Sequence, residues 1–155
     1  MSWIANGNDR ESVLAKVPAI AAPFNALYRS LWSQEHLPPA ILELCRLRLA
    51  QLHRCDGELN RTEVEVLPSL REALAHWERS ELFGAPERAC LAFTEVYAMD
   101  AQALTDSHAE AVKAEFGDAG LVLLVEALGI LDGMVRLALL WQLPTTGAVR
   151  KAGAA

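Results

Sequence analysis

The stretch LPPAILELCRLRLAQLHRCDGEL, residues 37–59, joins an apolar helical pattern directly to a short polar run. Its two prolines suit the first turn of a helix. Apolar side chains then recur at three-to-four spacing, at Ile41, Leu42, Cys45, Leu49 and Leu52. This spacing predicts an amphipathic helix over 37–53.

The same period continues on both sides of that stretch. Helical patterns cover residues 23–33, 86–99, 105–116 and 119–142, and Asp118 is placed to cap the last of them. Residues 62–79 also fit a helix with Thr62 as its cap, and Pro68 is expected to kink or split it. No useful length alternates with period two, so the sequence predicts an all-α fold.

Composition predicts one domain with its own core. The chain has 155 residues, of which 52% are apolar and 22% charged. A net charge of −6, with arginines scattered among acidic residues, argues against nucleic acid as a partner. Three unevenly spaced cysteines and no secretory signal pattern predict a reducing, cytoplasmic location without a disulfide framework.

Residues 121–141, LVLLVEALGILDGMVRLALLW, are long enough to cross a bilayer. Glu126, Asp132 and Arg136 interrupt the segment, and each charge would be costly at the centre of a membrane. We therefore expect no membrane span, but a helix that is nearly all buried. A domain of this size can cover only part of such a helix, so a homo-oligomer is expected to cover the rest.

The polar run holds the candidate for chemistry. If it were helical, Cys55, Glu58 and Thr62 would share one face at i, i+3 and i+7. A redox cysteine must ionise, and the carboxylates of Asp56 and Glu58 oppose ionisation of this thiol. The alternative is a cysteine that simply begins a helix.

Metal and cofactor chemistry have little support in the sequence. His53 lies two positions from Cys55 and would project to another side, and no closely spaced histidine pair exists. We expect neither a metal nor a cofactor. His53 is a candidate base, and the alternative is that it is only a surface residue. For Glu43 the alternative to a chemical role is a salt bridge with Arg46 on the same helix.

Residues 37–59 nevertheless resemble the alkylhydroperoxidase D-like (AhpD-like) proteins of the carboxymuconolactone decarboxylase superfamily. That family places a glutamate twelve residues before the first cysteine of a Cys-x-x-Cys-x-x-x-His motif, and Glu43 and Cys55 have this separation. The segment ERACLAFTE, residues 87–95, and the long helix that closes the chain are similar to later family segments. The resemblance covers roughly residues 37–141 and implies a bundle of about six to eight helices, assembled as dimers, trimers or hexamers.

The resemblance also implies roles for individual residues. It makes Glu43 a proton relay, Cys55 the first redox cysteine, position 58 the second cysteine and position 62 the relay histidine. Here Glu58 cannot form a disulfide and Thr62 cannot take up a proton near neutral pH, so the dithiol cycle is broken at both positions. In one straight helix Glu43 and Cys55 would lie about 18 Å apart, so any relay requires a bend.

Two hypotheses remain from the sequence. The first is an enzyme with altered chemistry, antioxidant-type or decarboxylase-like by resemblance. In it Cys55 acts alone, or Glu43 and Glu58 serve as acid and base, with His53 as a substitute base. The second is an inactive oligomeric binding or scaffold protein that holds a small molecule. Under both hypotheses we expect an N-terminal helical segment at 1–36, an AhpD-like core at 37–143 and a disordered tail at 144–155.

Overall fold

The computed structural model describes residues 3–143, and these form seven α-helices and two short 3-10 helices without a strand. The predicted all-α class is confirmed. The α-helices are α1 Arg10–Leu14, α2 Pro18–Ser33, α3 Pro39–Leu52, α4 Asp56–Leu59, α5 Pro68–Ala73, α6 Ala85–Asp100 and α7 Asp106–Leu140, and the 3-10 helices are Leu74–Arg79 and Ala101–Ala103. The predicted tail lies outside the described residues.

Prolines determine where several helices begin. A proline occupies one of the first two positions of α2, α3, α5 and α6, where its missing N–H costs no helical hydrogen bond. The helix predicted over 37–53 is found at Pro39–Leu52. Pro68 likewise begins α5 instead of kinking a longer helix, and residues 60–67 are not helical. The cap predicted at Thr62 is therefore wrong.

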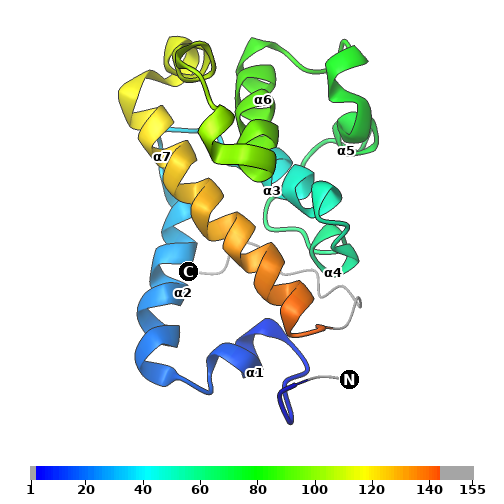
Figure 1. The fold of residues 1–155 in the computed structure, drawn as a ribbon, viewed down its shortest axis with the longest axis vertical. Coiled ribbons are helices and arrows are strands. Elements are labelled where there is room, and N and C mark those ends of the chain that lie inside the picture. The colour runs from blue at the N-terminus through cyan, green and yellow to red at the C-terminus, as the bar shows by residue number, and fades with distance from the viewer. Residues whose placement is uncertain (1–2, 144–155) are drawn as a thin grey trace.

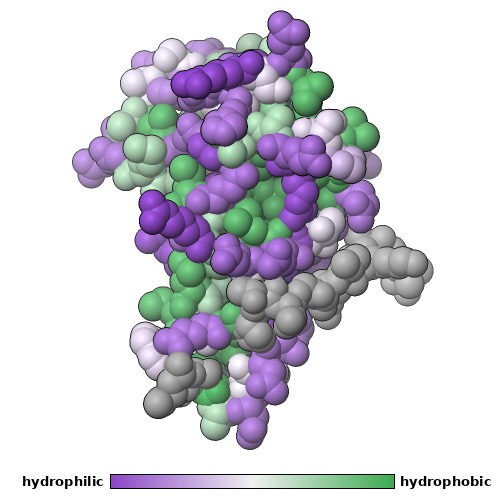
Figure 2. Space-filling view, turned by 90° about the vertical axis from the view of Figure 1, so that its right-hand side faces the viewer, coloured by the Kyte–Doolittle hydropathy of each residue, from purple (hydrophilic) through white to green (hydrophobic). Residues whose placement is uncertain are grey.

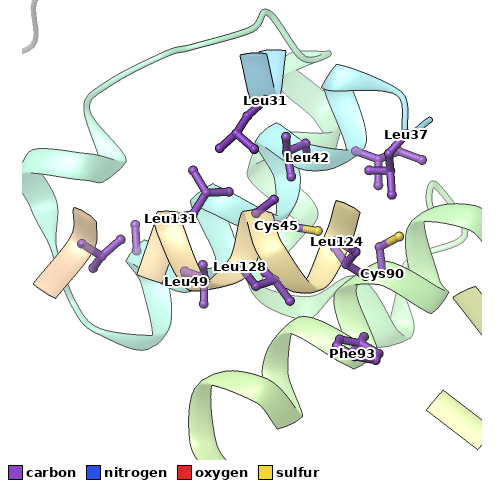
Figure 3. Close-up of a cluster of buried hydrophobic side chains, with 14 of the residues drawn as sticks. Leu31, Leu37, Leu42, Cys45, Leu49, Cys90, Phe93, Leu124, Leu128 and Leu131 are labelled. Carbon is purple, nitrogen blue, oxygen red and sulfur yellow. The ribbon is translucent and has the colours of Figure 1, made fainter. Parts of the chain in front are cut away.

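The core lies where α3, α6 and α7 pack against one another (Figure 1). Leucines from α3 and α7 interdigitate there, and the sulfur atoms of Cys45 and Cys90 lie among them (Figure 3). Both thiols are free and fully buried. Burial raises the pKa of Cys45 to about 12. These two cysteines are therefore part of the apolar core.

The helix α7 bends at Gly117, whose φ of +66° is rarely adopted by residues with a Cβ. The bend separates the two helical patterns predicted at 105–116 and 119–142. No helix among residues 3–143 has the length and apolar character needed to cross a membrane.

Beyond this bend α7 is buried on one face only. Exposed apolar side chains remain on it at Val122, Val125, Leu139 and Leu140. The expectation of a helix that is nearly all buried is thus wrong for the single chain. Cover by a second subunit stays a prediction.

Charged and polar side chains cover much of the remaining surface. Figure 2 shows the face formed by the right-hand side of Figure 1, where hydrophilic side chains predominate and apolar ones gather near the middle. The helix α2 stands at the opposite side of the bundle, with α1 packed against its lower end beside the end of α7 (Figure 1). This arrangement places the N-terminal helices against the end of the core where α3 leads into α4.

Candidate functional site

A sharp turn between α3 and α4 builds the candidate site. His53 ends α3, Arg54 adopts the left-handed conformation with φ of +53°, and Cys55 is the N-cap of α4. The chain therefore reverses after α3, and Glu58 returns to the side of α3 that carries Arg46. The bend that a relay required is present, and it brings Glu43 close to Glu58 through their shared partner Arg46.

Arg46 is the centre of this arrangement. Its Nε and Nη2 donate to the two carboxylate oxygens of Glu43, both at 2.8 Å, and its Nη1 donates to Glu58 Oε2 at 3.1 Å. Arg46 is 1% exposed, Glu43 0% and Glu58 2%. The pairing of Glu43 with Arg46 that the sequence offered as an alternative is confirmed. A bidentate pair at this depth is held in one geometry.

Two more arginines and one more glutamate complete what we call the Arg–Glu cluster. Arg10 pairs with Glu58 through a short contact, and Arg61 Nη2 donates to Glu63 Oε1 at 2.9 Å. The cluster thus contains three arginines and three glutamates: Arg10, Arg46, Arg61, Glu43, Glu58 and Glu63. Because the formal charges cancel, the group can be buried without an unpaired ion.

The cluster shifts the acidity of its glutamates in two directions. Burial raises the pKa of Glu43, although the Arg46 guanidinium opposes that shift. Burial acts in the same direction on Glu63, but hydrogen bonding and the charge of Arg61, with Arg46 and Arg10, hold its pKa below the ordinary value. Glu63 is therefore a carboxylate at neutral pH.

Arg46 also explains why Thr62 is not where the sequence placed it. Its guanidinium donates to the backbone carbonyls of Glu58 at 2.9 Å and Arg61 at 2.8 Å. These bonds hold the chain in a non-helical path after Leu59, where α4 ends. The shared helical face predicted for Cys55, Glu58 and Thr62 is therefore wrong, because Thr62 lies beyond the helix.

Cys55 lies on the other side of the turn, against α7. Its side chain is buried, and its Sγ is 4.0 Å from the carbonyl oxygen of Val135. Burial raises the pKa of this thiol, and the carboxylates of Glu58 and Asp56 act in the same direction. The backbone N–H groups of Glu58 and Gly57 oppose the shift without reversing it. Cys55 is thus a neutral thiol at pH 7, as its acidic neighbours in the sequence predicted.

A pocket of about 220 Å³ opens beside Cys55. Polar residues of the α3–α4 turn form one wall and the end of α7 forms the other. The lining residues are Arg54, Cys55, Asp56, Gly57, Ala138, Leu139, Gln142 and Leu143. The pocket is large enough for a small organic molecule with one apolar face.

His53 has a partner that sequence reasoning missed. Its Nε2 lies 2.5 Å from Asp132 Oδ1, and Arg136 Nε donates to the other oxygen of Asp132 at 2.7 Å. The side chains of His53 and Asp132 are only 19% and 12% exposed, so the surface alternative for His53 is wrong. The sequence feature that points to this partner is the pair Asp132 and Arg136, four residues apart within an apolar segment.

The predicted site residues therefore fall into two groups. Glu43 and Glu58 belong to the Arg–Glu cluster, whereas His53 and Cys55 lie along α7, facing Asp132 and Val135 one turn apart. Sequence reasoning also missed Arg10, which reaches the cluster from α1, and Glu63, which lies beyond the end of α4. Across residues 3–143, no three histidine, cysteine or acidic side chains gather closely enough to hold a metal ion.

Solved structures of the same architecture place this arrangement among known folds. Over 97% of this chain and all of the other, the structure is similar to a protein of unknown function from Agrobacterium tumefaciens, provisionally assigned as the antioxidant defence protein AhpD. The TM-score is 0.74 and the identity 17%. The chain has an AhpD-like fold.

Two further structures share the AhpD-like fold. An uncharacterised peroxidase-related protein from Silicibacter sp. TM1040 has a TM-score of 0.74 and 16% identity, over 86% of this chain and 74% of that one. A variant of the debrominase Bmp8 in complex with 2,3,4-tribromopyrrole has a TM-score of 0.77 and 15% identity, over 88% and 75% of the two chains. No protein-family model and no curated protein matches the sequence. The likeness is one of fold, which by itself does not determine activity.

Proposed function

We propose that this chain is a non-redox protein of the AhpD-like fold that binds a small molecule beside Cys55. The observation that carries the proposal is the position of Glu58. Where the resemblance calls for a reactive thiol, this chain has a carboxylate paired with Arg10 and Arg46 in the interior.

This pairing removes the second half of a dithiol cycle. A disulfide forms when one thiolate attacks another sulfur, and Glu58 offers none. The remaining cysteines cannot replace it, because Cys45 and Cys90 are fully buried thiols whose pKa values are raised by burial. If a peroxide oxidised Cys55 to a sulfenic acid, that group would therefore find no resolving thiol within the described part of the chain.

The pocket beside Cys55 supports the binding half of the proposal. Ala138, Leu139 and Leu143 give it an apolar wall, while Arg54 and Asp56 bring charge to the other side. The debrominase Bmp8, which shares the fold, has been captured with a small brominated pyrrole. A flat apolar molecule with one polar edge fits this distribution of side chains.

Hydroperoxide turnover tests the loss of redox chemistry. The wild-type chain and Cys55→Ser would be given an organic hydroperoxide with and without a dithiol, and consumption of the peroxide followed. At each condition we expect wild type and Cys55→Ser to consume the peroxide at the same rate as the reagents without protein. A dithiol-dependent rate that disappears in Cys55→Ser would refute the proposal.

Binding is tested with 2,3,4-tribromopyrrole as the probe and two matched variants. Leu139→Arg would place a charge in the pocket wall, whereas Leu140→Arg changes a neighbour of similar exposure that does not line it. We expect the probe to raise the melting temperature of the wild type and Leu140→Arg but not of Leu139→Arg. Equal shifts in all three chains, or none in the wild type, would exclude this pocket.

One observation favours an altered enzyme as the second candidate. The N–H groups of Gly57 and Glu58 point to the sulfur of Cys55, as donors that would stabilise a thiolate if one formed. In one-cysteine chemistry Cys55 would take an oxygen from a hydroperoxide, giving a sulfenic acid and an alcohol. Mass spectrometry after hydroperoxide treatment distinguishes the candidates, with Cys90 as the internal control. Selective oxidation of Cys55 would favour the enzyme.

We also propose that the chain forms a homo-oligomer. The exposed apolar side chains of α7 at Val122, Val125, Leu139 and Leu140 support this, because exposed apolar patches are commonly covered by a partner. Light scattering after gel filtration measures the assembly directly. A monomer that is insensitive to Val125→Glu would contradict the proposal.

A further inference from the structure

Arg10 lies in a site that the rest of the chain builds for a planar cation. Its Nη2 contacts Glu58, its Nη1 lies 3.9 Å from Glu63 Oε1, and its Cζ lies 5.3 Å from the centroid of the Tyr28 ring. Two carboxylates at the edge and one aromatic face are the groups that recognise a guanidinium. Arg10 is itself 4% exposed, so the bound group is removed from water.

The walls of this guanidinium site do not depend on Arg10. Glu58 is held by Arg46 at 3.1 Å, and Glu63 is held by Arg61 at 2.9 Å. The Tyr28 hydroxyl donates to Glu63 at 3.1 Å, which fixes the ring. The site therefore stays assembled when Arg10 leaves.

Charge gives the site its preference. Without Arg10 the Arg–Glu cluster retains two arginines and three glutamates, which leaves one negative charge in the interior. A buried charge of this kind requires a counter-ion. The Nε of Arg10 is buried without a hydrogen-bond partner among the described residues, so Arg10 does not use all its donors there.

The helix that carries Arg10 is lightly attached. The five-residue α1 borders a mainly apolar pocket of about 310 Å³, which Val13 and Leu14 line together with Ile20 and Trp141. Val13 is its buried apolar residue. Arg10 is the other buried residue of α1, so its ion pair is one of the contacts that tether this segment.

We infer that Arg10 is an internal occupant of a binding site for a small alkylguanidinium compound. When α1 moves away, the compound takes the place of Arg10 between Glu58, Glu63 and the Tyr28 ring. In the resting chain Arg10 blocks the site, and the apparent affinity is reduced to the fraction of molecules in which α1 is detached. This site is separate from the pocket beside Cys55.

The test removes the internal occupant. Arg10→Ala and wild type would be titrated with n-propylguanidinium, with n-propylammonium as the matched cation and Arg29→Ala, an exposed arginine of α2, as the matched variant. We expect Arg10→Ala to bind n-propylguanidinium about tenfold or more tightly than wild type or Arg29→Ala. A tenfold gain corresponds to α1 being detached in about a tenth of wild-type molecules. Adding Glu63→Gln to Arg10→Ala should abolish the gain.

Two results of the titration would overturn the inference. One is a folded Arg10→Ala that binds no more tightly than wild type, and the other is equal binding of both cations. If Arg10→Ala fails to fold, the titration is repeated with Arg10→Met, which keeps an apolar stem but removes the guanidinium. Hydrogen exchange on the wild type tests the site without either variant. Addition of n-propylguanidinium should speed amide exchange at residues 10–15, and n-propylammonium should not. Equal exchange rates with the two cations would reject the site.

Discussion

The two sides of the α3–α4 turn are built in opposite ways. On one side the Arg–Glu cluster is closed, and each of its carboxylates has an arginine partner. On the other side Cys55 and His53 line α7, beside a pocket that opens to solvent. The two sides differ because Glu58 faces inward to the arginines while Cys55, three residues earlier, faces α7. A single turn therefore separates a closed ionic network from an open pocket.

The largest expected effect tests the closed side. Glu58→Gln leaves Arg10 and Arg46 without their shared carboxylate in the interior, so we expect a loss of about 3–5 kcal/mol in the free energy of unfolding. Urea denaturation measures it. The control is Glu110→Gln, an exposed partner of Lys113, with a change of about 0.5 kcal/mol or less. Similar losses in both variants would mean that the cluster does not stabilise the fold.

A smaller effect is expected on the open side. Asp132→Asn keeps the shape of the side chain but removes the charge that His53 and Arg136 share, so we expect a loss of about 1–3 kcal/mol. The same denaturation experiment applies, with the exposed Asp118→Asn as the matched control. A loss as large as that of Glu58→Gln would erase the difference between the two sides.

Acid separates the two sides further. The pKa of Glu63 is lower in the folded chain than its ordinary 4.5, so its contribution is present above that pH and is lost as the pH falls through the folded value. Wild-type stability should decline below about pH 4.5, and Glu63→Gln should decline less steeply. Melting temperatures between pH 3 and pH 6 measure this difference. Parallel curves would show that Glu63 has no depressed pKa.

The smallest effect concerns Cys55 and leaves stability unchanged. Because its pKa is raised above the ordinary 9.0, alkylation by iodoacetamide should be slower than that of free cysteine at pH 7 and should keep rising beyond pH 9.0. Mass spectrometry of the labelled peptide follows the rate. A rate at pH 7 that exceeds that of free cysteine would indicate an activated thiol and would favour the enzyme.

Much of the fold was predictable because helices follow local pattern. Apolar spacing and prolines located α3, α6 and both parts of α7, and they excluded strands. The error at residues 60–67 arose because the backbone there is held by Arg46, fifteen residues before Arg61. A local pattern contains no information about such a donor.

The site was predictable only in part. The separation of Glu43 and Cys55 indicated the right fold, and the pairing of Glu43 with Arg46 followed from their spacing on one helix. The partners Arg10 for Glu58 and Asp132 for His53 lie 48 and 79 residues away in sequence. Only the packing of α1 and α7 against the turn selects them.

The sequence alone determined the all-α class, several helix starts and the presence of Glu58 and Thr62 at two positions of the candidate site, because each depends on residue identity and short spacing. The tertiary structure decided that Glu58 closes a buried ionic network and that His53 pairs with Asp132. It did so because burial allows a charge only where an opposite charge is brought to it from elsewhere in the chain.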